Sequence, residues 1–130
     1  MQVKRVKLST LHHDPANTRK HNDRNLGAIV SSLKEFGQVE PLVVQKGTGK
    51  VIGGNGRLTA MLSMGTEEAM VVEVDATDSR AAALAIALNR TAELAEWDDA
   101  ALAQALAALQ NDESIDALVP GFNEKEMQQL

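Results

Sequence analysis

Residues 51–65, VIGGNGRLTAMLSMG, decide the local fold more than any other part of the chain. The stretch begins with two β-branched residues that end an apolar run, which is typical of a strand. Three glycines and one asparagine follow at residues 53–56. Apolar residues at helical spacing then run from Arg57 to Gly65, and glycine is common just after the end of a helix. The stretch therefore predicts a strand, a tight glycine turn and a helix.

This glycine turn is a candidate phosphate-binding site. A strand-to-helix junction directs unpaired backbone N–H groups and the positive end of the helix dipole at one point, which suits an anion. Glycine lets a ligand approach the backbone, and Arg57 can hold phosphate oxygens with two hydrogen bonds. We expect that a Cβ at Gly54 or Gly56 would spoil the turn, and that Gly54→Val weakens ligand binding more than stability. The alternative is that the glycines serve only the turn and Arg57 is solvated. The spacing fits neither a Walker loop nor the GxGxxG fingerprint.

Composition limits the class of protein. A chain of 130 residues with 44% apolar residues allows one domain with a real core. No stretch approaches the run of about 18 apolar residues that spans a membrane, and the N-terminus alternates like a strand rather than a signal peptide. The absence of cysteine excludes disulfides, thiolate metal sites and a cysteine nucleophile. We therefore expect a soluble, cytoplasmic protein without membrane association.

The charge is distributed unevenly along the chain. Up to Arg57 there are ten Lys or Arg and four Asp or Glu, whereas from Leu58 onward there are three and fourteen, and the net charge is −5. A basic N-terminal half can contact DNA, and an acidic C-terminal half is repelled by it. We expect weak DNA binding by the chain alone, or that both halves are simply solvated surfaces.

The first ninety residues predict alternating strands and helices. A helix capped by Asn22 or Asp23 and ended by Gly37 follows a polar loop over residues 12–22. The expected strands are Val3–Leu8, Pro41–Val44, Val51–Ile52 and Met70–Val74, the last with Glu73 exposed.

The last third predicts helices only. One helix is capped by Asp78, a second by Asp98 or Asp99, and a third starts at Asn123 with a capping-box pattern and ends at Leu130. Trp97, between the first two, is expected to be a core anchor.

Several ordered segments together resemble the ParB/sulfiredoxin superfamily. They are NTRKH (residues 17–21), GQVEPLVV (37–44), IGGNGRLTAMLSMG (52–65) and ALNRTAELAEWD (87–98). The chain looks closest to the ParB-like nuclease-domain proteins of phages and mobile elements, which often accompany DNA methyltransferases. The resemblance implies a mixed α/β (α+β) fold, with a small four-stranded mixed sheet and helices in a core over residues 1–76. An all-helical extension over residues 77–130 is expected to pack on this core as one compact unit.

The resemblance also implies a nucleotide site, because ParB proteins bind CTP and sulfiredoxins bind ATP. Gly54–Arg57 stand where the GERR-type motif of ParB wraps the triphosphate. Asn55 stands near the catalytic cysteine of sulfiredoxins, so sulfinate reduction is excluded. Leu88–Asn89 align with a Glu–Asn pair that helps hold the metal on the nucleotide, and Leu88 cannot ligate a hard cation such as Mg²⁺. The candidate nucleotide-binding residues are Asn17, Arg19, Gln38, Gly53, Gly54, Asn55, Gly56, Arg57, Asn89 and Arg90.

Three histidines, His12, His13 and His21, fall within ten residues. They could suggest a metal site, but no close carboxylate pair or cysteine completes it, and loop histidines are usually solvated. We therefore predict no metal ligands, and note that His21 closely follows Arg19 in the NTRKH segment.

The leading hypothesis is a nucleotide-binding ParB-like domain that takes CTP or ATP, with or without Mg²⁺, in DNA transactions of a phage or mobile element. Whether the chain is an enzyme stays open. One alternative is a metal-dependent DNA nuclease or small-molecule phosphotransferase, with Glu40 as a weak candidate for the acid or base. Another is a non-catalytic module that binds a methyltransferase or forms a homodimer through apolar residues of the last third, or these residues belong to the core of the domain itself. They are Leu102, Leu106, Leu109 and Leu118.

Overall fold

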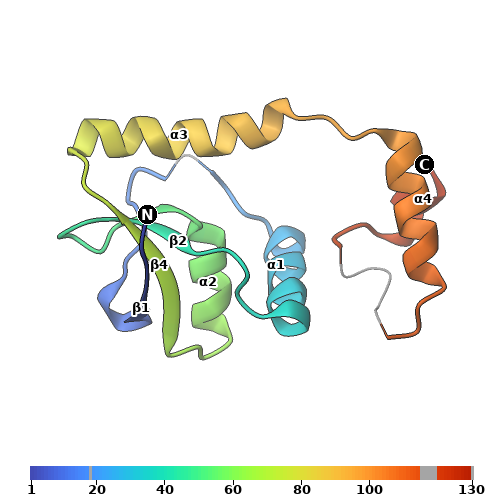
Figure 1. The fold of residues 1–130 in the computed structure, drawn as a ribbon, viewed down its shortest axis with the longest axis horizontal. Coiled ribbons are helices and arrows are strands. Elements are labelled where there is room, and N and C mark those ends of the chain that lie inside the picture. The colour runs from blue at the N-terminus through green and yellow to red at the C-terminus, as the bar shows by residue number, and fades with distance from the viewer. Residues whose placement is uncertain (18, 115–119, 130) are drawn as a thin grey trace.

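The part of the chain that the structure describes forms one mixed four-stranded sheet (Figure 1). The computed structural model describes residues 1–17, 19–114 and 120–129. The strands are β1 (Val3–Lys7), β2 (Leu42–Gln45), β3 (Val51–Gly53) and β4 (Glu68–Val74), in the order β1-β4-β2-β3. β1 pairs with β4 and β2 with β3 in antiparallel fashion, whereas β2 and β4 are parallel. The expected mixed α/β fold is therefore confirmed.

Within the described residues, the helices are a short 3-10 turn, η1 (Leu8–Thr10), and five α-helices. They are α1 (Asp23–Phe36), α2 (Asn55–Ser63), α3 (Asp78–Leu94), α4 (Asp99–Gln110) and α5 (Glu124–Gln128). The side chains of Asn22, Asp98 and Asn123 cap α1, α4 and α5 as their residue types predict, and Asn123 forms a capping box with Glu126.

The core lies between the sheet and α2. Leu42, Val51, Leu58 and Val71 are its largest fully buried side chains, and they come from β2, β3, α2 and β4. α1 packs against α2 on the side away from the sheet, and α3 runs over β3 (Figure 1). This arrangement places the β3–α2 turn between α1 and α3.

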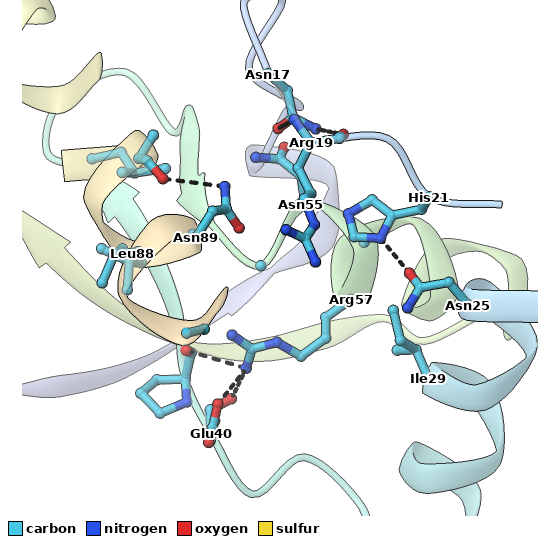
Figure 2. Close-up of a pocket in the computed structure, with 18 residues that line it drawn as sticks. Asn17, Arg19, His21, Asn25, Ile29, Glu40, Asn55, Arg57, Leu88 and Asn89 are labelled. Atoms are coloured by element: carbon cyan, nitrogen blue, oxygen red, sulfur yellow. Dashed lines mark hydrogen bonds and ion pairs between the residues drawn. The ribbon is translucent and has the colours of Figure 1, made fainter. Parts of the chain in front are cut away.

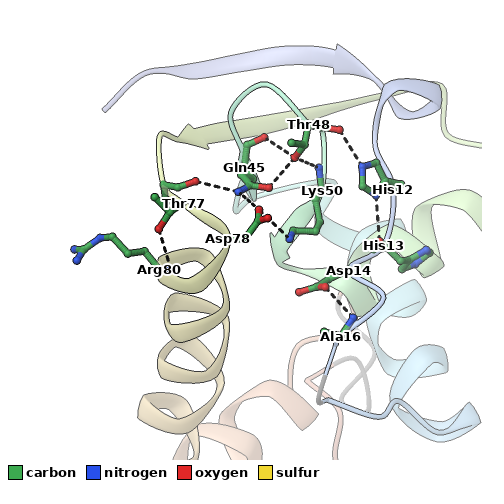
Figure 3. Close-up of polar contacts among 11 residues, drawn as sticks. His12, His13, Asp14, Ala16, Gln45, Thr48, Lys50, Thr77, Asp78 and Arg80 are labelled. Atoms are coloured by element: carbon green, nitrogen blue, oxygen red, sulfur yellow. Dashed lines mark hydrogen bonds and ion pairs between the residues drawn. The ribbon is translucent and has the colours of Figure 1, made fainter.

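A polar cluster around the buried Gln45 connects the start of α3 to the hairpin between β2 and β3 (Figure 3). The Gln45 side chain is buried, and its Nε2 donates 3.0 Å bonds to the Ala76 carbonyl and to Asp78 Oδ1. Thr48 Oγ1 donates to Gln45 Oε1 at 2.9 Å. The Asp78 carboxylate thus accepts a hydrogen bond from Gln45. The expectation that Asp78 caps α3 is wrong, because the Thr77 side chain caps this helix.

The C-terminal helices lie away from the sheet. α4 lies beyond α1 (Figure 1), and Arg24 of α1 forms an ion pair with Glu126 and donates to the Gly121 carbonyl. Leu106 is buried and its neighbours Leu102 and Leu109 are half-buried, so these residues already pack within the chain. Leu118 and Leu130 lie outside the described residues.

Trp97 is not a core anchor. Its side chain is 67% exposed, and its ring meets that of Phe122 edge-on at a centroid distance of 5.6 Å. The residue lies in the extended link between α3 and α4, and this link runs away from the core. Within the described residues, no helix is long and apolar enough to cross a membrane.

Candidate functional site

The β3–α2 turn has the conformation that its glycines predict. Gly54 is the N-cap of α2 and has φ +98°, in the left-handed region that favours glycine. A Cβ there would lie 2.6 Å from Leu42 Cδ2 and 3.1 Å from Arg57 Nη2. No side chain caps this helix, so the backbone N–H groups of its first turn are directed at the adjacent space. α2 begins at Asn55, two residues before the expected start at Arg57.

The Asn55 side chain is part of the scaffold. It is buried, its Nδ2 donates to the Val51 carbonyl at 2.9 Å, and its Oδ1 accepts from the Asp14 amide at 3.2 Å. Both ends of the side-chain amide are therefore used to fasten the turn and the loop after β1. What Asn55 can offer a ligand is its backbone N–H in the first turn of α2.

Arg57 lies on the wall of the site, in the first turn of α2. Its Nη1 donates to the Glu40 carbonyl at 2.8 Å and lies 3.8 Å from the Glu40 carboxylate. Burial lowers the pKa of the Arg57 guanidinium, and the Glu40 charge opposes that effect. An arginine stays protonated at physiological pH, so the site contains a partly desolvated cation.

A cavity of about 870 Å³ adjoins the turn, between the loop before α1, α1, β3, α2 and α3 (Figure 2). The side chains of Arg19, His21, Asn55 and Arg57 gather around this space, with Leu88 and Asn89 on its α3 side. The predicted residues that line it are Asn17, Arg19, Glu40, Gly53, Gly54, Asn55, Gly56, Arg57 and Asn89.

Two predicted residues are placed elsewhere. Gln38 is bound to β4, where its side-chain amide both donates to the Met70 carbonyl and accepts from the Met70 amide at 2.8 Å. Arg90 is exposed on α3 and lies 3.5 Å from Glu93. Neither residue lines the cavity. The Gln38 side chain is bound to the backbone of β4, and the Arg90 side chain is exposed beside Glu93.

Arg19 reaches the cavity from the loop before α1, whereas Arg57 reaches it from α2. Arg19 forms an ion pair with Glu93 of α3, which connects the loop before α1 to that helix. Asn17 shapes this loop: its Oδ1 accepts from the Arg19 amide and its Nδ2 donates to the Arg19 carbonyl, both at 3.1 Å. The Arg19 and Arg57 side chains thus line one cavity, although 38 positions separate them in the sequence.

The other wall of the cavity is apolar. It is formed by Val43, Ile52, Ala85 and Leu88. A Cβ at Gly53 would lie 3.0 Å from Leu88 Cδ1, so β3 and α3 approach closely there. A basic end and an apolar end together suit a ligand with an anionic group and a flat uncharged group.

The residues of the cavity do not form a metal site. Among the described lining residues, Glu40 is the only carboxylate, and it faces Arg57. The described part of the chain holds no cluster of three His, Cys, Asp or Glu side chains that could ligate a metal. His12 forms a hydrogen bond with the Thr48 carbonyl, and His13 forms one with the Thr59 hydroxyl. Neither histidine lines the cavity.

Three residues that line the cavity are not among the nucleotide-binding residues expected from the sequence. They are His21, Asn25 and Ile29. His21 follows Arg19 so closely that the NTRKH segment could have signalled it. Asn25 and Ile29 have no such signal, because their position depends on how α1 packs against α2.

Comparison with known proteins defines the class. The family model of the ParB N-terminal domain matches residues 1–90. The chain therefore belongs to the ParB N-terminal domain family.

One curated relative and two solved structures illustrate the similarity. A probable chromosome-partitioning protein ParB of Campylobacter jejuni is 29% identical over 87 residues, which cover 65% of this chain and 31% of the relative. The chain thus spans about a third of that relative's length. The C-terminally truncated ParB of Caulobacter crescentus, complexed with CTP-gamma-S, matches with a TM-score of 0.79 and 16% identity over 98% of this chain and 75% of that one. A Pnob8-like ParB-N domain matches with a TM-score of 0.52 and 23% identity over 61% of this chain and 32% of that one. At these identities the two structures show the fold.

Proposed function

We propose that this chain binds a nucleoside triphosphate in the cavity beside the β3–α2 turn. The amides of the first turn of α2, together with Arg57 and Arg19, contact the phosphates, and the apolar wall with Asn89 accepts the base and sugar. The observation that carries this proposal is the convergence of the uncapped helix start and two arginines from distant segments on one cavity.

CTP is the first nucleotide to test, and ATP the second. The similar ParB of Caulobacter crescentus carries CTP-gamma-S, and its fold matches almost the whole of this chain. Any magnesium is expected to arrive on the nucleotide phosphates rather than on the protein, because Glu40 is the only carboxylate among the described residues of the cavity.

We further propose that the domain acts in cytoplasmic DNA transactions, as a partition-type protein or as a protein of a phage or mobile element. The family and the chromosome-partitioning relative support a role with DNA. The N-terminal half, with its ten Lys and Arg residues, is the proposed DNA-contacting part. A second copy of the chain or a DNA methyltransferase is the proposed protein partner.

A nuclease is not favoured by the site. Hydrolysis of DNA with metal ions requires carboxylates that converge on one or two metals, and the described residues form no such group. Glu40 is at the cavity and faces Arg57, so it is the residue to mutate if nucleotide turnover is detected.

Calorimetric titration tests the nucleotide proposal. We expect CTP or ATP, with magnesium present, to bind the wild type with a dissociation constant below about 1 mM, and Arg57→Ala to weaken binding at least about tenfold. Arg80→Ala is the matched control, because Arg80 is exposed on α3 and outside the cavity. Absence of binding by CTP, ATP and GTP would contradict the proposal, and so would an equal loss in both variants.

A further inference from the structure

His21 lies directly against the turn that is proposed to bind phosphate. A Cβ at Gly56 would be 2.6 Å from His21 Cε1 and 2.8 Å from each ring nitrogen. Gly56 has no positive φ, so its backbone does not require glycine. The imidazole occupies the space that a side chain at residue 56 would fill. It is thereby held at the first turn of α2, in the cavity that Arg19 and Arg57 also line (Figure 2).

The orientation of the His21 ring is fixed by α1. His21 Nδ1 forms a hydrogen bond with Asn25 Oδ1. Asn25 is in turn held by the helix cap, because its amide donates to Asn22 Oδ1 at 2.7 Å. This bond engages Nδ1, so Nε2 is the ring nitrogen that remains for a ligand.

The charges that face His21 are mostly positive. Arg57 of α2 and Arg19 of its own loop line the same cavity, and Glu40 before β2 is the carboxylate opposite, already beside Arg57. α1 faces the ring with the neutral Asn25, and the α3 residues of the cavity are uncharged, while Glu93 of α3 is paired with Arg19. A phosphate bound in this cavity would face the imidazole together with the two arginines.

We propose that His21 contacts the phosphates of the bound nucleotide through Nε2, and that ligand binding is coupled to protonation of this imidazole. Affinity then rises as the pH falls through the range in which histidine titrates. This inference rests on the proposed function and assigns to the same site a third phosphate-binding side chain with a pH dependence.

Titration of CTP near pH 6 and near pH 8 tests the inference, with ATP used instead if the wild type prefers it. We expect the wild type to bind about tenfold more tightly at the lower pH than His21→Gln does, with the two within about twofold at the higher pH. His13→Gln is the matched control: His13 bonds to Thr59 of the same helix α2 but does not line the cavity, and this variant should behave like the wild type. Comparing variants at the same pH removes the titration of the nucleotide's own terminal phosphate, whose pKa is also about 6.

A measurement on the wild type alone guards against a folding defect in His21→Gln. The pH titration of the His21 ring, followed by NMR, should have its midpoint shifted upward when CTP is present. An unchanged midpoint overturns the inference, and so does a pH dependence of affinity that His21→Gln shares with the wild type. If the wild type binds no nucleotide at either pH, the proposed function itself fails, and the two failures are thus distinguishable.

Discussion

At the scale of single residues, neighbours in the glycine turn have different tasks. Asn55 uses its side chain to hold the turn to the loop after β1, whereas Arg57 is kept at the cavity wall by the Glu40 carbonyl. Gly54 supplies a left-handed backbone, and Gly56 supplies room for His21. From the sequence, Gly54, Gly56 and Arg57 are candidates either for phosphate binding or for a purely structural turn. The family resemblance adds Asn55 to the nucleotide site.

This division changes the expectation for Gly54. A Cβ there would press on Leu42, which is fully buried, so a substitution affects the core as well as the ligand site. We now predict that Gly54→Ala lowers the free energy of unfolding by about 1–3 kcal/mol, because φ +98° strains any L-residue. Chemical denaturation measures this. Gly27→Ala in α1 is the control, since a Cβ there meets nothing within 4 Å and should stabilise the helix by roughly 0.5–1 kcal/mol. Equal stability of Gly54→Ala and the wild type would contradict the assignment.

At the scale of elements, the sequence predicted what local chemistry determines. The sequence predicts α1 with its cap at Asn22 or Asp23 and its end before Gly37, because both signals lie within the segment itself, and Asn22 is the cap. The strands were found to within about two residues. The order β1-β4-β2-β3 is a property of long-range pairing, and only the family resemblance anticipated a mixed sheet.

The predictions that were wrong also concern features that long-range contacts decide. Trp97 is apolar and aromatic, but its burial depends on where the link between α3 and α4 leads, and it leads away from the core. Thr77 and Asp78 can both cap a helix, and the contact of Asp78 with Gln45 decides between them.

In the candidate site, the position of Arg57 could be predicted from the glycine motif, and the presence of Arg19 in the same cavity was expected from the superfamily's order of segments. His21 and Asn25 depend on the packing of α1 against α2.

The ion pair between Arg19 and Glu93 joins the loop before α1 to α3 at the edge of the cavity. A phosphate competes with the Glu93 carboxylate for the Arg19 guanidinium. We therefore predict that Glu93→Gln binds CTP about two- to fivefold more tightly than the wild type, since an exposed ion pair contributes at most about 1 kcal/mol. Glu96→Gln, an exposed change in the link after α3, should have no effect. Weaker binding by Glu93→Gln, measured by calorimetry, would show that the carboxylate supports the site instead.

At the scale of the whole molecule, the basic and acidic parts of the sequence meet in the sheet and diverge outside it. The basic part forms β1, α1, β2, β3 and the start of α2, whereas the acidic part forms the rest of α2, β4, α3, α4 and α5. Ion pairs of Lys4 with Glu73 and of Arg5 with Glu68 join the two parts between β1 and β4. We propose that residues 1–76 and 77–130 form a single unit. The packing of α3 on β3, the bond from Gln45 to Asp78 and the ion pair from Arg24 to Glu126 support this.

Arg24 of α1 contacts Glu126 and the Gly121 carbonyl, and this attachment of residues 121–128 to α1 should depend on pH. The hydrogen bond from the Asn123 amide, followed by that from Arg24, lowers the pKa of Glu126. A carboxyl group with a lowered pKa in the folded state stabilises it above the unfolded value of about 4.3, and this stabilisation is lost as the pH falls through the folded value. We predict that the segment detaches from α1 on acidification below about pH 4.

Trp97 reports this detachment, because it is the single tryptophan and it contacts Phe122 beside the capping box. Its fluorescence should change with a midpoint below about pH 4 in the wild type. Glu126→Gln should already have the acid spectrum near neutral pH, whereas Glu124→Gln, exposed in the same turn, should follow the wild type. A wild-type spectrum in Glu126→Gln would refute the attachment.

If the first turn of α2 holds the phosphates of a nucleotide, its backbone amides must respond when the nucleotide binds. The most direct test follows the backbone amide resonances of the isotope-labelled protein during a CTP titration. We predict the largest changes at Asn55, Gly56 and Arg57, whose N–H groups start the helix, together with the Arg57 side-chain Nε–H. No change at these amides at about 1 mM CTP, or changes confined to a different part of the chain, would contradict it.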